Sequence, residues 1–203
     1  MKKILSGLIL ATLLGSLAFT VASTDPITIG ADLPKAAVKM QDVSGKMISI
    51  KDAAKANGVL VMFSCNTCPY VLKNQDRTVE IAAYALQKDL GVIVLNSNEA
   101  YRTKDDSFDA MKAYAKDQKY KWSYVVDKNH EIADAFGANR TPEVFMFDKN
   151  MKLVYHGAID DNPSDATAVN RSHLKMAINE LTEGKEISVK ESKSVGCSIK
   201  RNK

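Results

Sequence analysis

Val59-Leu60-Val61-Met62-Phe63-Ser64-Cys65-Asn66-Thr67-Cys68-Pro69 is the stretch of sequence that decides the fold. Residues 59–64 are almost all apolar, which predicts a strand buried on both faces of a sheet. The residues that follow show the 3.6-residue apolar repeat of a long helix, at positions Leu72, Val79, Ala83, Leu86 and Leu90. Two cysteines separated by two residues therefore stand between a buried strand and the start of a helix.

This placement favours redox chemistry at the cysteine pair. A helix begins with unpaired N–H groups and a partial positive charge, and both favour a thiolate over a thiol. Cys65 is positioned to attack a disulfide, and Cys68, one turn further on, is positioned to resolve the mixed disulfide. We therefore predict a redox site in which Cys65 is the exposed partner and Cys68 is tucked behind it.

Two other interpretations of the pair remain open. Half of a zinc site is one, although no second cysteine pair and no closely spaced histidine pair follows to complete four ligands. An inert structural disulfide is the other, although a bridge that closes so short a loop gains little from chain entropy. The strand before the cysteine pair and the helix after it fit a redox site better than they fit a zinc site or a structural disulfide.

The N-terminal residues predict export. A short basic start is followed by an apolar stretch too short to span a membrane comfortably, and then by small residues near Ala22. We expect residues 1–22 to be a cleaved signal peptide, with an uncleaved anchor as the alternative. The mature protein would then lie in the periplasm or outside the cell, free of the membrane, in an oxidising compartment where disulfides persist.

Composition is that of an ordinary globular protein. The chain has 203 residues, of which 45% are hydrophobic and 26% charged, and a formal net charge of +4. We predict one domain over residues 23–184 and a basic tail over residues 185–203. The tail carries six basic and two acidic residues, and we expect it to be solvated. The nearly neutral domain argues against nucleic acid as a partner.

The rest of the chain predicts alternating strands and helices. A hairpin is expected around Ser44-Gly45, between residues 37–40 and 47–50, followed by a helical turn over residues 51–56. Further strands are expected at residues 92–96, 122–126, 143–147 and 153–155, and helices after Ser107 and at residues 131–136 and 172–183. Strand, helix and strand in succession around the cysteines indicate a parallel crossover.

Three segments carry a resemblance to a known family. Residues 63–70, 155–161 and 196–200, together with Thr141-Pro142, resemble the thioredoxin superfamily. Within it, the sequence is similar to the redoxin branch (alkyl hydroperoxide reductase/thiol-specific antioxidant), and to a peroxiredoxin-like subgroup with a Cys-x-x-Cys motif. The resemblance implies an α/β, thioredoxin-like fold: a central mixed sheet flanked by helices, with an N-terminal β-hairpin.

The resemblance also implies roles for particular residues. Cys65 would be the nucleophile and Cys68 the resolving thiol. Thr141-Pro142 would be a cis-proline turn that faces the pair and offers backbone groups to a substrate chain as an added strand. Arg140 stands where a peroxide-polarising arginine would stand. Tyr70 either lines a substrate groove or packs under the helix.

The family pattern leaves more than one function open. Peroxiredoxins carry a threonine or serine three residues before the peroxidatic cysteine, and this chain has Met62 there. We therefore favour thiol–disulfide exchange with client protein or small-molecule disulfides, coupled to an electron donor or acceptor. A thiol peroxidase is one alternative. A copper chaperone that binds through the cysteine pair and His156 is another, although we expect neither a metal nor a cofactor.

Two further features have their own expectations. Cys197, in the tail, is either shielded against the domain or a third redox thiol. We favour shielding, with its sulfur beyond disulfide reach of Cys65 and Cys68. Asp105 and Asp106 follow a polar segment, and we expect both to be solvated loop charges.

Overall fold

The fold is built around a seven-stranded mixed sheet. The computed structural model describes residues 25–202, and the predicted signal peptide lies outside them. In order across the sheet the strands are β2 (Met47–Ile48), β1 (Met40–Asp42), β5 (Ser123–Val126), β4 (Gly91–Asn96), β3 (Val59–Ser64), β7 (Glu143–Phe147) and β8 (Leu153–Gly157). A separate pair is formed by β6 (Arg140–Thr141) and β9 (Cys197–Ser198).

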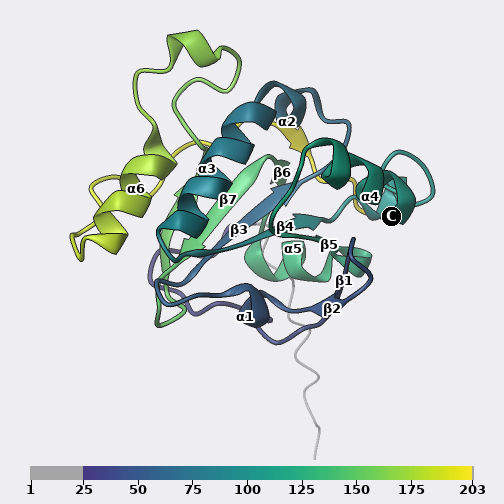
Figure 1. Cartoon of the computed structure of the whole chain (residues 1–203), viewed down its shortest axis with the longest axis horizontal. Helices are drawn as coiled ribbons and strands as arrows, with labels where there is room; N and C mark the ends of the chain where they lie inside the picture. The colour runs from purple at the N-terminus through teal and green to yellow at the C-terminus, as the bar shows by residue number, and fades with distance from the viewer. Residues whose placement is uncertain (1–24, 203) are drawn as a thin grey trace, which may run out of the picture.

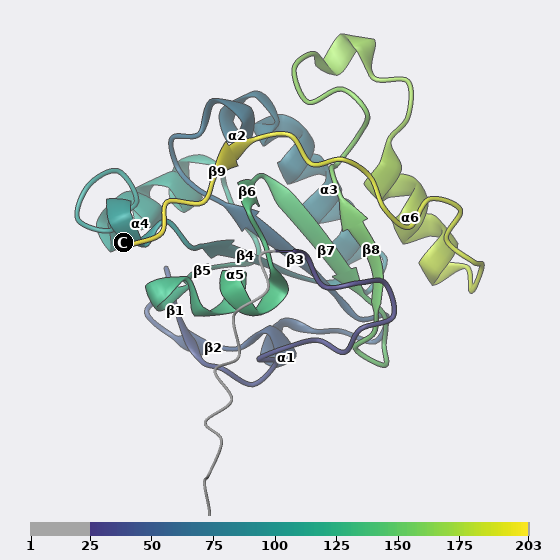
Figure 2. The same ribbon diagram turned by 180° about the vertical axis from the view of Figure 1, so that it is seen from behind.

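Helices cover both faces of this sheet. Figure 1 shows α3 (Gln75–Gln87) and α6 (His173–Thr182) in front of it, and Figure 2 shows α1 (Ile50–Ala53) and α5 (Glu131–Phe136) on the opposite face. The remaining α-helices are α2 (Pro69–Lys73) and α4 (Phe108–Asp117). This arrangement confirms the predicted α/β, thioredoxin-like fold with a central mixed sheet, flanking helices and an N-terminal hairpin.

The predicted central strand is confirmed residue for residue. β3 pairs in parallel with β4 and antiparallel with β7, and all six of its residues are buried. A strand with neighbours on both edges and helices on both faces has no contact with water, which explains why its sequence is continuously apolar rather than alternating. The cysteine motif begins directly where this strand ends.

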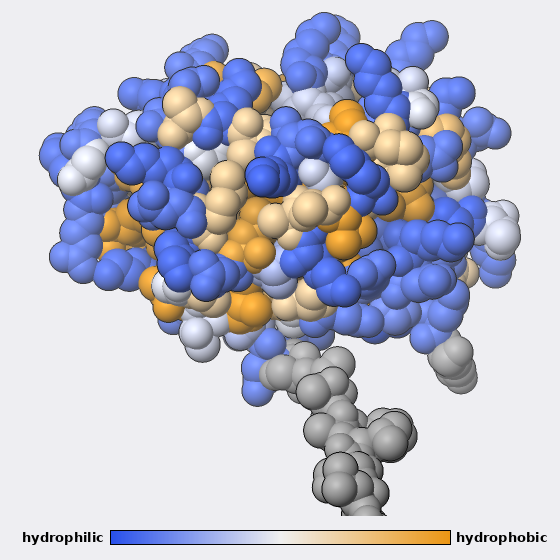
Figure 3. Space-filling model, turned by 90° about the horizontal axis from the view of Figure 1, so that it is seen from below, coloured by the Kyte–Doolittle hydropathy of each residue, from blue (hydrophilic) through white to orange (hydrophobic). Residues whose placement is uncertain are grey.

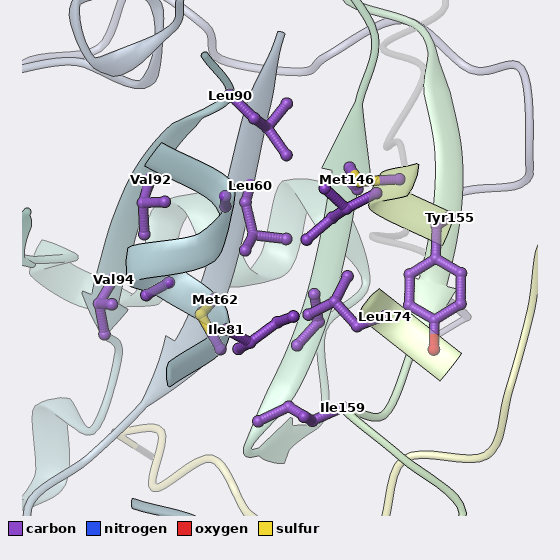
Figure 4. Packing of buried hydrophobic residues seen from close by; sticks show 14 of the residues in the cluster. Leu60, Met62, Ile81, Leu90, Val92, Val94, Met146, Tyr155, Ile159 and Leu174 are labelled. Carbon is purple, nitrogen blue, oxygen red and sulfur yellow. The ribbon is translucent and has the colours of Figure 1, made fainter. Parts of the chain in front are cut away.

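Alternate side chains of β3 enter two separate cores. Leu60 and Met62 join the core under α3 and α6, where Figure 4 shows Met62 beside Ile81. Val61 and Phe63 join the core under α1 and α5. There the Phe63 ring meets Phe136 edge-on, with ring centroids 5.4 Å apart. Such aromatic pairs add to the stabilisation that burial alone gives.

The helix after the motif differs from its prediction. It is divided at Asn74 into α2 and α3, and Leu72 is 51% exposed rather than turned inward. The Asn74 side chain explains the division, because its Nδ2 donates to the Tyr70 carbonyl at 2.7 Å and to the Pro163 carbonyl at 2.9 Å. A side chain that bonds to nearby backbone in this way competes with a regular helix.

The predicted hairpin is present, but β1 begins at Met40 rather than at residue 37. Asp42 sets its turn by accepting the Ser44 N–H at 2.8 Å, and Gly45 adopts the left-handed conformation at φ +87°. The turn therefore lies where the sequence places it. The first strand is shifted towards the turn, and the second, β2, ends at Ile48 rather than at residue 50, because Ser49 caps α1.

The C-terminal tail is docked, so the expectation of a solvated tail is wrong. Ile187 and Ile199 are buried at 6% and 5% exposure. The tail runs along β8, where the His156 N–H donates to the Lys190 carbonyl at 2.9 Å and the His156 carbonyl accepts the Ser192 N–H at 3.0 Å. It then crosses the sheet edge as β9, the yellow strand in Figure 2. The tail thus becomes a part of the fold at the cysteine end.

Within residues 25–202, no helix is long and apolar enough to cross a membrane. The face seen from below in Figure 3 intersperses apolar side chains with hydrophilic ones. The surface of that face is therefore mixed in character rather than uniformly apolar.

Candidate active site

The two motif cysteines lie in the loop between the end of β3 and the start of α2. Cys68 is the N-cap residue of α2, as the sequence predicts. The expectation that Cys65 is exposed is wrong, because Cys65 is 2% exposed and Cys68 is 4% exposed. Both are free thiols, so the structure shows the reduced site.

Thr141 and Pro142 close one side of this site. The predicted cis peptide bond joins them. The Thr141 hydroxyl lies 3.4 Å from Cys65 Sγ, and the Thr141 carbonyl oxygen lies 3.2 Å from Cys68 Sγ, where it accepts a hydrogen bond whenever Cys68 carries the proton of the pair. The structure thus confirms that this turn packs against the cysteine pair, and it adds a hydroxyl contact to Cys65 that the sequence did not suggest.

The other two predicted site residues occupy different surroundings. Tyr70, in the first turn of α2, is half-buried and packs against the cluster that contains both cysteines. Arg140 is exposed, and its Nη1 donates to the Gly196 carbonyl of the tail at 3.4 Å. The Arg140 guanidinium therefore contacts the docked tail.

Cys197 lies at the site, so the expectation that it stands beyond reach is wrong. β9 pairs with β6 in antiparallel register, which sets Cys197 opposite Thr141. The Cys197 side chain packs against the cluster formed by Cys65, Cys68 and Val71. Cys197 is also one of the groups that lower the pKa of Cys68. The site is therefore a cluster of three thiols.

A buried carboxylate under the motif loop was also missed. Asp106 is fully buried rather than solvated. Its Oδ1 accepts the Asn66 backbone N–H at 2.9 Å and Asn96 Nδ2 at 2.7 Å, and its Oδ2 accepts Asn98 Nδ2 at 2.9 Å. Asp105, its neighbour, is exposed and contributes only a carbonyl to Asn66. These bonds fix the loop that presents the cysteines.

The signal for this network was present in the sequence. Asn96-Ser97-Asn98 follows a buried strand, and amides at such a position need partners once they are covered. The same network reaches the tail, because Asn98 Oδ1 accepts the Lys200 N–H at 2.8 Å. The motif loop and the tail are therefore held by one set of polar contacts.

The pKa values of the two motif thiols are displaced in opposite directions. Hydrogen bonding from the Cys65 thiol, with a smaller contribution from Cys197, outweighs burial, which raises the pKa, and lowers the pKa of Cys68 to about 4. The same bond to Cys68, together with burial and the Asp106 charge, raises the pKa of Cys65. The pair therefore holds a single proton between two sulfurs, and its titration belongs to the pair.

We expect this thiolate to persist in the reduced, folded protein down to about pH 4, because the pKa of Cys68 falls there from its ordinary value of 9.0. Thiolate ultraviolet absorbance, followed against pH, measures it directly. Between these two values the unfolded chain binds one more proton at this residue, so this contribution to stability grows as pH rises and is lost as pH falls towards 4. The urea-unfolded protein is the control, and an ordinary thiol titration in the folded form would contradict the expectation.

The His156 side chain contacts residues near the site other than the cysteines. Its Nε2 lies 2.8 Å from Glu143 Oε1, and its ring stacks on Phe145 with centroids 4.4 Å apart. Among residues 25–202 no group of three or more His, Cys, Asp and Glu side chains is placed to hold a metal ion. Because His156 is held by these contacts, it is not placed to bind copper together with the cysteine pair.

A dithiol at a helix start, packed against a cis-proline at the end of a mixed sheet, defines the class of thioredoxin-like oxidoreductases. The comparison with known families agrees with this geometry. The family model described as Redoxin matches residues 28–171, and the chain belongs to this family.

Individual relatives are similar over most of the chain. Thiol-disulfide oxidoreductase ResA of Bacillus thuringiensis is 27% identical over 152 residues, covering 72% of this chain and 82% of that protein. The structure of an uncharacterised conserved protein from Geobacillus kaustophilus has a TM-score of 0.80 and 31% identity, covering 86% of this chain and 93% of that one. A hypothetical protein from Sinorhizobium meliloti has a TM-score of 0.80 and 28% identity, covering 88% and 97%.

Proposed function

We propose that this protein is an exported thiol–disulfide oxidoreductase that exchanges disulfides through Cys65 and Cys68. The observation that carries the proposal is a pair of buried free thiols at a helix start, both in contact with Thr141 of the cis-proline turn. The name of the Bacillus relative describes the same chemistry for that protein.

The reaction begins at Cys65. The proton that the pair shares moves to Cys68, and the resulting Cys65 thiolate attacks one sulfur of a client disulfide. A mixed disulfide forms, and the other client sulfur leaves as a thiolate that takes up the proton from Cys68. Cys68 then attacks Cys65 Sγ, which forms the Cys65–Cys68 disulfide and frees the reduced client. The Thr141 hydroxyl, 3.4 Å from Cys65 Sγ, supports negative charge on that sulfur. The reverse sequence oxidises a client dithiol, and an electron donor or acceptor returns the site to its starting state.

Substrate contacts follow from the same turn. Thr141 and Pro142 present backbone beside the thiols, Tyr70 forms the wall next to them, and Arg140 lies at the rim. Extended clients bind such an edge through main-chain hydrogen bonds. Client protein and small-molecule disulfides are the two substrate classes that this chemistry accepts.

Export is the part of the proposal that the N-terminal sequence supports. Residues 1–22 have the basic start, apolar stretch and small residues of a secretory signal. The oxidising compartment beyond the membrane supplies disulfides for the site to exchange.

A thiol peroxidase is the second candidate, and the Thr141 hydroxyl beside Cys65 is the observation that favours it. We expect peroxide reduction to be slow beside disulfide exchange, because Met62 lies in the core where peroxidases place a hydroxyl. Stopped-flow oxidation of the reduced protein by hydrogen peroxide, and separately by oxidised glutathione, measures both rates.

A peroxide rate of about 10⁶ M⁻¹s⁻¹ or more, on the scale of efficient enzymes, would place peroxidase activity first. Thr141→Val is the matched variant, since it removes the hydroxyl and keeps the side-chain shape. If Thr141→Val lost reactivity with peroxide but kept reactivity with oxidised glutathione, the peroxide site would lie at Thr141.

A further inference from the structure

The tail brings Cys197 to the site along the edge that β6 presents. β9 pairs with this edge, with Ser198 opposite Arg140 and Cys197 opposite Thr141. Gly196 makes the approach possible, because a Cβ on this residue would lie 2.1 Å from the Thr141 carbonyl oxygen. The last residues are fixed as well, since the Ile199 N–H donates to the Asn139 carbonyl at 3.0 Å.

Cys197 is the accessible member of the three-thiol cluster. Cys65 and Cys68 are almost fully buried, whereas Cys197 is partly exposed. Its side chain packs on both of them. A reagent or client that approaches the docked form therefore meets Cys197 before it meets either motif cysteine, and access is one of the factors that set the rate of thiol exchange.

We propose that Cys197 is a third redox residue of this site, which exchanges with the Cys65–Cys68 disulfide through Cys68 and carries the disulfide to the surface. The inference rests on the proposed function, because that function supplies the Cys65–Cys68 disulfide. The reactive partner is a thiol or disulfide small enough, or extended enough, to reach Cys197 in the docked tail.

The step balances without an added oxidant. The Cys197 thiolate attacks Cys68 Sγ, a Cys68–Cys197 bond forms, and the Cys65–Cys68 bond breaks. Cys65 leaves as a thiolate and takes up the proton that Cys197 gave up. One disulfide and one thiol are present before and after the step. A client thiolate that attacks Cys197 Sγ then forms a mixed disulfide with Cys197, and Cys68 leaves as a thiolate. A second client thiolate attacks the client sulfur of that mixed disulfide, which leaves the disulfide on the client and releases Cys197 as a thiolate.

The charges around Cys197 favour this step once Cys65 and Cys68 have formed their disulfide. In the reduced site, burial and the negative Cys68 sulfur raise the pKa of Cys197, which keeps it a thiol. Oxidation of Cys68 to a disulfide removes that negative charge. Lys200 lowers the pKa of Cys197 and remains in place. Cys197 thus gains nucleophilic character when its target has been oxidised.

The test uses the full mature protein with Cys65→Ser, which leaves Cys68 and Cys197 as its two thiols. After oxidation with oxidised glutathione we expect most molecules to carry a Cys68–Cys197 disulfide, found as a bond between tryptic peptides 56–73 and 194–200. Mixed disulfides with glutathione on Cys68 or Cys197, without that bond, would overturn the proposal.

Gly196→Ala in the same background is the matched control. It keeps both thiols, but its Cβ displaces β9 from Thr141, so we expect at least a tenfold lower yield of the linked peptides. An unchanged yield would mean that the docked geometry does not direct the bond, which overturns the proposal. A thermal melt verifies that this variant is folded.

Wild-type protein and Cys197→Ser separate this proposal from the proposed function. If neither forms a Cys65–Cys68 disulfide with oxidised glutathione, the proposed function fails. Where both form it, we expect reduction of the oxidised Cys197→Ser protein by glutathione to be at least tenfold slower than that of wild type. Equal rates would overturn the role of Cys197 and leave the proposed function intact.

Discussion

Cys65→Ser is expected to slow dithiothreitol-driven reduction of insulin at least tenfold. Serine keeps the shape of the side chain, but its hydroxyl is not a nucleophile at neutral pH, so no mixed disulfide forms at this position and only the Cys68–Cys197 pair remains to react. Cys68→Ser is expected to give the complementary result. It retains the attacking sulfur of Cys65 and loses the resolving one, so mixed disulfides with the client accumulate and are visible on non-reducing gels.

The control for this pair of variants is Cys68→Ser combined with Cys197→Ser. Cys197 packs against the cluster that contains Cys68, and the double variant removes any resolution by the tail thiol. Mixed disulfides at Cys65 should therefore be at least as long-lived in the double variant as in Cys68→Ser. Full insulin reduction by Cys65→Ser would refute the assignment of Cys65 as nucleophile.

Asp106→Ala is expected to lower the free energy of unfolding by about 3 kcal/mol or more. The substitution leaves the Asn66 N–H and the side-chain amides of Asn96 and Asn98 without their buried acceptor, and each such donor costs about 1–3 kcal/mol. Urea unfolding of the reduced protein measures the loss.

Asp105→Ala is the control for this second variant, because Asp105 is exposed and its only contact to the motif is through its carbonyl, which alanine retains. We expect a change within about 0.5 kcal/mol, as for surface substitutions in general. Asp106→Ala should also lower the pKa of Cys65, since the Asp106 charge raises it. Equal stability of the two variants would show that the network does not hold the motif loop.

The elements that local sequence specifies were predicted well. The continuous apolar run of β3 and the helix over residues 131–136, which ends at Gly137 with φ +64°, both appear as expected. Each depends on neighbouring residues alone: an apolar pattern, or a glycine that accepts a left-handed conformation. The position of Cys68 at the start of α2 follows from an equally local pattern, whereas the cis bond before Pro142 was expected from the family resemblance.

The features that depend on distant partners were not predicted. β6 and β9 have two residues each, too few for a period, and the residues they pair are more than fifty positions apart. Asp106 is buried by the loop that it holds, which no pattern around it reveals. Leu72 fits the helical repeat of α3, but it lies in α2, before the break at Asn74. The Asn74 side chain makes this break by donating to the Pro163 carbonyl, which is distant in sequence.

The tail that covers the cis-proline edge makes the protein its own competitor for that edge. A segment tethered to the same chain acts at an effective concentration on the order of millimolar, so an extended client must displace β9 before it can pair with Thr141. Weakly binding peptides fail this competition at ordinary concentrations. Selection among clients is thus set by the strength of tail binding, and small disulfides that need no strand pairing escape it.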